Sequence, residues 1–132
     1  MKATKTSFYF YSKHVYLQVA QFAVMKELKD KIEGVIEGDL LIEHFATITG
    51  AITGNLTVRE PARLVIRGTV AKDVFVGYGS IVQVFGNIGG NVYLEGGMLE
   101  LWGTINGSII RKAGPAMIYS EATINGKITG SA

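Results

Sequence analysis

Apolar residues recur from Gly34 onward in a repeat of 16–19 residues. Each repeat starts with a small residue, usually glycine, then any residue, then isoleucine or valine. The six starts are Gly34-Val-Ile36, Gly50-Ala-Ile52, Gly68-Thr-Val70, Gly86-Asn-Ile88, Gly103-Thr-Ile105 and Ala122-Thr-Ile124. A second column lies four residues after each start and holds Gly38, Gly54, Lys72, Gly90, Gly107 and Gly126. Two columns that keep the same spacing indicate an internal repeat.

Apolar and polar residues also alternate within each repeat, with the period of two that is typical of half-buried strands. Two apolar columns follow each start: Leu40, Leu56, Val74, Val92, Ile109 and Ile128, then Ile42, Val58, Val76 and Leu94. Apolar pairs precede the next start: Ala46/Ile48, Leu64/Ile66, Val82/Val84 and Leu99/Leu101. Each repeat therefore predicts about three short strands.

A repeat of this length suits one turn of a β-helix, because helical hairpins and propeller blades need about 33–45 residues. We therefore expect an all-β fold, a single-stranded β-helix (β-solenoid) of five to six coils. Glycine and Asx residues fit its corners, where positive φ angles and close backbone approach are needed. One corner column contains Asp39, Asn55, Asp73 and Asn91. Turn chemistry and side-chain ladders explain this column without a metal ion.

The N-terminal segment does not follow the repeat, so we divide the chain into an arm, residues 1–33, and a β-helix domain, residues 34–132. Phe8–Tyr11 and Val15–Val19 alternate like strands, and Ala23–Lys31 has helical periodicity. We expect this arm to cap the upstream end of the solenoid, whose strand edges would otherwise be unpaired. The alternative is weak contact of residues 1–26 with an anionic membrane surface, because Lys2, Lys5 and Lys13 flank the aromatic run Phe8–Tyr11.

Charge and composition exclude several classes of protein. Residues 1–31 hold six lysines and two acids, whereas residues 32–132 hold seven Lys/Arg and nine acids. A mildly acidic body argues against nucleic-acid binding, which usually needs a basic stripe on the folded face. The chain has no cysteine, so disulfides and thiol chemistry are excluded and a cytoplasmic location is the default expectation.

No group of residues predicts catalysis, so we expect a non-enzymatic protein without cofactor or metal. The only histidines are His14 and His44, and the carboxylates Asp73, Glu95 and Glu100 are isolated on outward positions. Aliphatic residues fall six apart from Ile52 to Leu94, as in hexapeptide-repeat acyltransferases. The 16-, 17- and 19-residue turns break that hexad pattern, which makes an acyltransferase-like enzyme the least favoured alternative.

The runs LVIRGTVAKDVFV (Leu64–Val76) and LELWGTINGSII (Leu99–Ile110) resemble bactofilins, the bacterial polymer-forming cytoskeletal proteins. The resemblance covers about residues 34–130 and concerns the repeat pattern. It implies a right-handed, triangular β-helix that assembles through its ends into filaments without nucleotide, often near the inner membrane surface. Residues 7–32 depart from the short tails of that family. A weaker similarity of Val84-Phe-Gly-Asn-Ile88 to the β-helix of the division inhibitor MinC leaves a binding module for a protein partner as the alternative.

Outward positions predict the surfaces through which the chain acts. One lateral stripe contains Leu41, Thr57, Phe75, Tyr93 and Ile110, and a second contains Val65, Phe85, Trp102 and Tyr119. Large apolar side chains in such a row need cover, either from the N-terminal arm or from another protein. Ile128 lies at the downstream end, where no cap follows in the sequence. We therefore expect a homo-oligomer, a dimer or a filament, that uses these residues.

Overall fold

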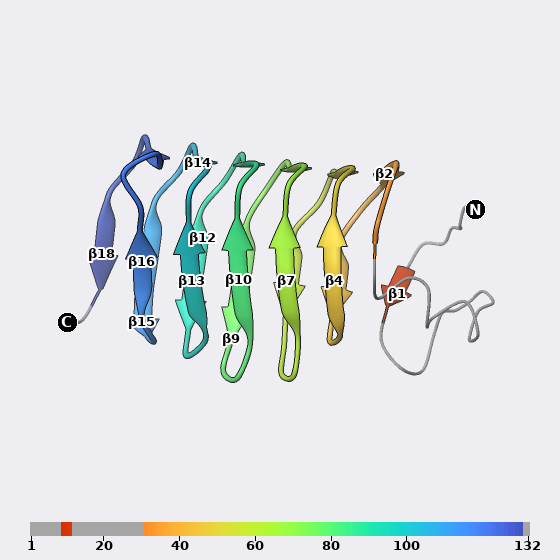
Figure 1. The fold of residues 1–132 in the computed structure, drawn as a ribbon, viewed down its shortest axis with the longest axis horizontal. Coiled ribbons are helices and arrows are strands. Elements are labelled where there is room, and N and C mark those ends of the chain that lie inside the picture. Colours follow the sequence, from red (N-terminus) through yellow and green to blue (C-terminus); the bar gives the residue numbers. More distant parts are fainter. Residues whose placement is uncertain (1–8, 12–30, 131–132) are drawn as a thin grey trace.

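The computed structural model of the 132-residue chain describes residues 9–11 and 31–130. These residues form strands and no helix, and the strands build three parallel sheets stacked as a β-solenoid of about five turns (Figure 1). The prediction of an all-β, single-stranded β-helix is confirmed. Among these residues, no helix has the length and apolar character needed to cross a membrane.

Each coil contributes one strand to each of the three sheets. Sheet A contains β1 (Tyr9–Tyr11), β3 (Leu40–Ile42), β6 (Leu56–Val58), β9 (Val74–Gly77), β12 (Val92–Glu95), β15 (Ile109–Ala113) and β18 (Ile128–Gly130). Sheet B contains β4 (Phe45–Ile48), β7 (Arg63–Ile66), β10 (Ile81–Val84), β13 (Met98–Leu101) and β16 (Ala116–Ile118). Sheet C contains β2 (Val35–Ile36), β5 (Ala51–Ile52), β8 (Thr69–Val70), β11 (Asn87–Ile88), β14 (Thr104–Ile105) and β17 (Thr123–Ile124).

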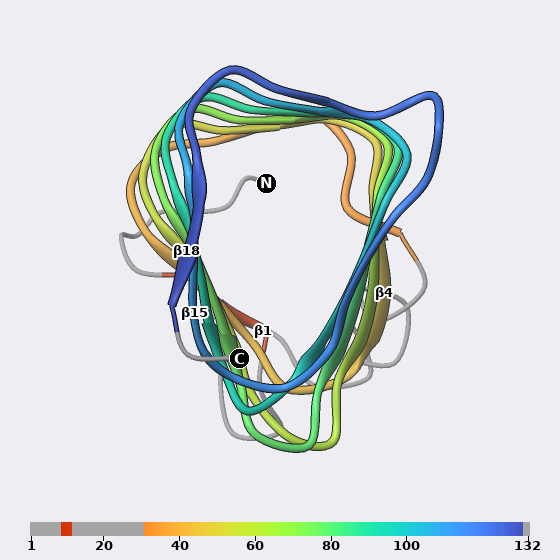
Figure 2. The ribbon, with the colours of Figure 1, turned by 90° about the vertical axis from the view of Figure 1, so that its left-hand side faces the viewer.

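The cross-section is a triangle with two long sides, sheets A and B, and one short side, sheet C (Figure 2). Seen from the downstream end, the chain runs up sheet B, across sheet C and down sheet A while it advances toward the viewer. This sense of rotation makes the solenoid right-handed. The side lengths follow from the strands, since central strands of sheets A and B have four residues and those of sheet C have two.

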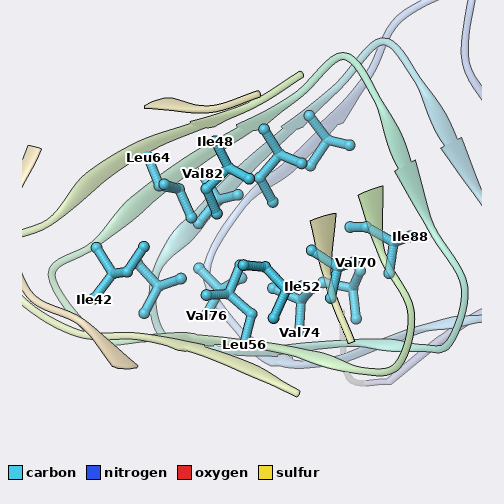
Figure 3. Packing of buried hydrophobic residues seen from close by; sticks show 14 of the residues in the cluster. Ile42, Ile48, Ile52, Leu56, Leu64, Val70, Val74, Val76, Val82 and Ile88 are labelled. Atoms are coloured by element: carbon cyan, nitrogen blue, oxygen red, sulfur yellow. The ribbon is translucent and has the colours of Figure 1, made fainter. Parts of the chain in front are cut away.

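Continuous rows of apolar side chains fill the interior, because neighbouring coils pair in register and place an apolar residue at each inward position. Ile36, Ile52, Val70, Ile88, Ile105 and Ile124 form one such row along sheet C. Side chains from the three sheets point toward one another inside the triangle (Figure 3). Most of these residues are fully buried, as the alternating pattern of the sequence predicts.

The glycines that start the four central repeats are required by the close approach of consecutive coils at one corner. The N–H of Thr104 donates to the carbonyl of Gly86 at 2.9 Å, and a Cβ added at Gly103 would overlap that same oxygen. The glycines at positions 50, 68 and 86 are in the same situation with respect to the coil before them. At these four positions a side chain would overlap the backbone of the coil before, which accounts for glycine there; Ala122 holds the equivalent position in the last coil.

The Asx column at the corner between sheets C and A forms a ladder of hydrogen bonds that joins consecutive coils. Asp39 Oδ1 accepts from the N–H of Asn55 at 2.8 Å, and Asp73 Oδ1 accepts from the N–H of Asn91 at 2.7 Å. The intervening and following members repeat the contact, up to Ser108. These side chains satisfy backbone donors that face the corner, which is the structural role predicted for this column.

The arm is described in part. β1 pairs in parallel with β3 and so covers the upstream edge of sheet A, in agreement with the strand predicted at Phe8–Tyr11. Ile32 is buried and bridges to Ile48, so the inward row of sheet B begins within the segment assigned to the arm. The strand predicted at Val15–Val19 and the helix predicted at Ala23–Lys31 lie outside the described residues except for Lys31. The membrane-contact alternative concerns residues that are likewise outside them, apart from β1.

We predict that Val70→Asp unfolds the solenoid. Val70 is fully buried in the row along sheet C, where an unpaired carboxylate costs several kcal/mol against a total stability of about 5–15 kcal/mol. Thermal melting followed by circular dichroism measures the loss. Thr69→Asp is the matched control, because Thr69 is the outward neighbour on the same strand and is exposed. Equal melting of the two variants would contradict the assignment of inward and outward positions.

Candidate assembly surfaces

The two ends of the solenoid differ in how their strand edges are covered. At the upstream end, β1 pairs with β3, and Ile32 bridges to the sheet B strand β4. At the downstream end, β16, β17 and β18 each pair on one side only with strands of the described residues. The last coil therefore presents a row of unpaired backbone donors and acceptors on all three sides.

Two inward-facing side chains of this last coil are exposed, unlike their equivalents in the central coils. Ile128 continues the row of Ile109 but is 55% exposed, whereas Ile109 is 0% exposed. Ile118 continues the row of Leu101 and is 39% exposed, against 0% for Leu101. The downstream end thus combines open strand edges with an open apolar core.

Of the predicted interface residues, four lie together on the outer face of sheet A. The register aligns Leu41, Thr57, Phe75, Tyr93 and Ile110 in one row. All of them are half-buried. The rings of Phe75 and Tyr93 stack with a centroid distance of 4.9 Å, and Asn91 Nδ2 donates to the Tyr93 hydroxyl at 3.3 Å.

Three more predicted residues form a stack at the corner between sheets B and C. The ring of Trp102 lies between Phe85, at a centroid distance of 4.5 Å, and Tyr119, at 4.3 Å. The guanidinium of Arg67 covers the upstream side of Phe85 at 4.6 Å from the ring centre. Val65, which the sequence grouped with this stripe, instead belongs to the outer row of sheet B.

These stacks account for much of the apolar area that the sequence suggested would need cover. Stacked rings bury one another's faces, and each pair adds about 0.5–1.5 kcal/mol beyond the area that it buries. Tyr93, Trp102 and Tyr119 are half-buried as a result. Ile128 is different, because it faces inward and is exposed only where the coils end.

Sequence analysis missed two residues of the downstream end. Ile118 was not assigned, because Pro115 and the longest spacing of the repeat, 19 residues, obscure the apolar pair of the last coil. Lys127 occupies the position of the Asx ladder, where its N–H donates to Ser108 Oγ at 2.9 Å. Its side chain offers no acceptor for a further coil, so the ladder ends there. The departure of Lys127 from the Asx column was the available signal.

Titratable groups are dispersed over the surface rather than gathered. Glu95 pairs with Lys112 at 3.8 Å, Glu100 accepts from Gln83 at 2.8 Å, and Asp73 serves the corner ladder. His44 is half-buried at the corner between sheets A and B. Within residues 9–11 and 31–130, no three histidines or acids come close enough to hold a metal ion.

No protein-family model, curated protein or solved structure matches this chain. The similarity to bactofilins therefore concerns the repeat pattern and the β-helix that the pattern specifies.

We predict that Trp102→Ala lowers stability by about 1–3 kcal/mol, because it removes both stacked pairs of the corner. The β circular-dichroism signal should persist, since the core rows are untouched. Chemical denaturation measures the free energy of unfolding. Thr104→Ala, on the adjacent strand β14, is the control and should change stability little. If Trp102→Ala unfolded with the same midpoint as the parent, the stack would have no stabilising role.

Proposed function

We propose that this chain is a non-enzymatic structural protein, similar to bactofilins, that self-associates through the downstream end of its β-solenoid. The observation that carries the proposal is the last coil, in which Ile118 and Ile128 face inward yet remain exposed. The three strands of that coil also lack a second neighbour among the described residues. A surface of this kind favours pairing with another strand edge.

A second copy of the chain is a suitable occupant. Its own last coil has the same triangular outline and offers the same three edges, so two such ends cover each other's apolar rows. Soluble solenoids need covered or polar terminal coils, and this requirement favours association over an exposed end. A binding module for a different protein would use the same surface, and the two functions differ in whether the purified chain associates with itself.

The lateral stripe of sheet A is the other candidate for self-association. Its aromatic side chains Phe75 and Tyr93 already stack on each other and are half-buried. The flank also has complete strand pairing, because β9 and β12 lie inside sheet A. Among the described residues, Ile118 and Ile128 at the downstream end have no such side-chain cover and the last strands have no second neighbour. This favours the downstream end over the flank as the surface of self-association.

We predict that Ile128→Lys converts the full-length oligomer into monomers. The change buries a charge in the apolar contact between two ends and should weaken association at least tenfold, since each tenfold corresponds to about 1.4 kcal/mol. The variant stays folded, because Ile128 is more than half exposed within one copy. Size-exclusion chromatography with light scattering at micromolar concentration measures the mass.

Thr129→Lys is the matched control, because it places the same charge on the same strand with the side chain outward. It should keep the parent's mass. If Ile128→Lys also kept that mass, the downstream end would not be the interface. A parent that is monomeric throughout the concentration range would contradict self-association itself.

We predict that the double substitution Phe75→Ser with Tyr93→Ser leaves the oligomeric mass unchanged. Both side chains face outward on sheet A, away from the downstream end, so their loss should lower stability without separating the copies. The same light-scattering experiment reports the mass, and circular dichroism reports the fold. Dissociation of this variant while Ile128→Lys remained associated would place the interface on the flank instead.

A further inference from the structure

We infer that Asn125 is a site of spontaneous deamidation, which converts it to aspartate or isoaspartate, and that the isoaspartate form releases the strand β18 from the solenoid. The inference concerns a single copy of the chain, so it does not depend on the proposed function. The observations that carry it are two Asn-Gly corners in consecutive coils, one hydrogen-bonded to coils on both sides and the other to a coil on one side.

Two asparagines of the chain, Asn106 and Asn125, are followed by glycine. Glycine has no side chain, so its backbone nitrogen approaches the side-chain carbonyl carbon of the preceding asparagine without steric hindrance. A branched residue after asparagine hinders this approach. The other asparagines each precede leucine, isoleucine or valine: Asn55, Asn87 and Asn91. The chemistry of deamidation therefore favours the two Asn-Gly pairs.

The two Asn-Gly pairs occupy the same corner of consecutive coils. β14 and β17 pair in register, and Asn106 and Asn125 are the residues that directly follow these two strands. Asn125 Nδ2 donates to Asn106 Oδ1 at 3.0 Å, and both residues are exposed to solvent. Hydroxide and water therefore reach both, so the difference between them lies in how the surrounding backbone is held.

The corner of Asn106 is hydrogen-bonded to the coil before it and to the coil after it. On the upstream side, the N–H groups of Asn106 and Gly107 donate to the carbonyls of Ile88 and Gly90 at 2.9 and 3.0 Å. On the downstream side, the carbonyl of Gly107 accepts from the N–H of Gly126 at 2.9 Å. Attack by the Gly107 nitrogen on the Asn106 side chain therefore requires this corner to separate from both neighbouring coils.

The corner of Asn125 is hydrogen-bonded to the coil before it. The N–H groups of Asn125 and Gly126 donate to the carbonyls of Ile105 and Gly107, each at 2.9 Å. Within residues 31–130 no further coil follows, and β17 and β18 each pair on one side only. Terminal segments open at a lower free energy than central ones. Asn125 should therefore reach the reactive conformation much more often than Asn106.

The reaction consumes one water molecule and needs no other reactant. The Gly126 nitrogen loses its proton to hydroxide and attacks Cγ of Asn125, which closes a five-membered succinimide ring. The Cγ–Nδ2 bond breaks, and the amide nitrogen takes up a proton and leaves as ammonia. Water then opens the ring: cleavage between the ring nitrogen and Cγ gives aspartate, and cleavage between the ring nitrogen and the backbone carbonyl carbon gives isoaspartate. Both products carry one additional negative charge.

Isoaspartate at position 125 lengthens the main chain by one carbon atom where the last coil turns from sheet C to sheet A. Just after this point, the N–H of Lys127 donates to Ser108 Oγ at 2.9 Å, and the N–H of Ile109 donates to the carbonyl of Lys127 at 2.8 Å. The added atom moves these groups out of register, so β18 should detach from β15. Ile109 is fully buried and would lose the cover of Ile128 in the next coil.

Peptide mapping by mass spectrometry measures deamidation at each site in the full-length chain, incubated at mildly alkaline pH. Each rate is divided by the rate of the same site in denaturant, which removes the influence of the following residues, Ser108 and Lys127. We expect this normalised rate to be roughly tenfold or more higher for Asn125 than for Asn106, because the last coil opens more readily. Equal normalised rates, or a faster reaction at Asn106, would overturn the inference.

The same measurement on Ile128→Lys separates this inference from the proposed function, because a second copy on the downstream end would also shield Asn125. Fast reaction of Asn125 in the variant supports the deamidation site, whether the parent reacts fast or slowly. Equal normalised rates of Asn125 and Asn106 in the variant would overturn the site even if the parent self-associates. Fast reaction in a parent that is monomeric would support the site and contradict the proposed function.

The release of β18 has its own test. Ion exchange separates the deamidated chain by its added charge, an isoaspartyl methyltransferase labels the isoaspartate, and hydrogen–deuterium exchange reads the strand pairing. We expect β15 and β18 to lose protection in the isoaspartate form while β7, β10 and β13 keep theirs. Asn125→Asp is the matched control, because it adds the same charge to an unchanged main chain, and it should stay protected. Full protection in the isoaspartate form, or equal loss in Asn125→Asp, would overturn the role of the lengthened main chain.

Discussion

Hydrogen bonding between consecutive coils fixes the rest of this structure. Each strand pairs in register with the strand one repeat before and one repeat after, so every coil must place the same kind of side chain at the same point. Inward positions become continuous apolar rows, and corner positions become columns of glycine or Asx. A residue of the wrong type in one strand would fit neither the strand before it nor the strand after it. This double constraint explains why the pattern in the sequence is so regular.

The same constraint leaves strand edges without a partner at the ends of the solenoid. A central coil finds its partners within the chain, but a terminal coil has them on one side only. β1 supplies a partner for sheet A at the upstream end. In the last coil Ile118 and Ile128 are exposed, and the three strands lack a second neighbour among the described residues; we propose that these features serve self-association.

Stacking of like residues also shapes the outer surface. Consecutive coils lie close enough for outward aromatic side chains to cover one another, as in the Phe85, Trp102 and Tyr119 stack. Such a ladder resembles an apolar patch in the sequence but exposes mainly ring edges in the structure. Within residues 31–130, no further ring or guanidinium lies against the downstream face of this stack.

The sequence alone determined the coil, its three strands and its core rows, because inward and outward positions alternate with a fixed period. It also predicted the structural role of Asp39, Asn55, Asp73 and Asn91, since glycine and Asx residues mark corners. Only the tertiary structure decided which apolar residues remain open. Phe75 and Ile128 are both large and apolar, yet one is covered by its stacked neighbour and the other is exposed at the end. Whether an apolar side chain is covered depends on the residues of the adjacent coils. The repeat pattern is the same in every coil, so it does not show which coil lacks a neighbour.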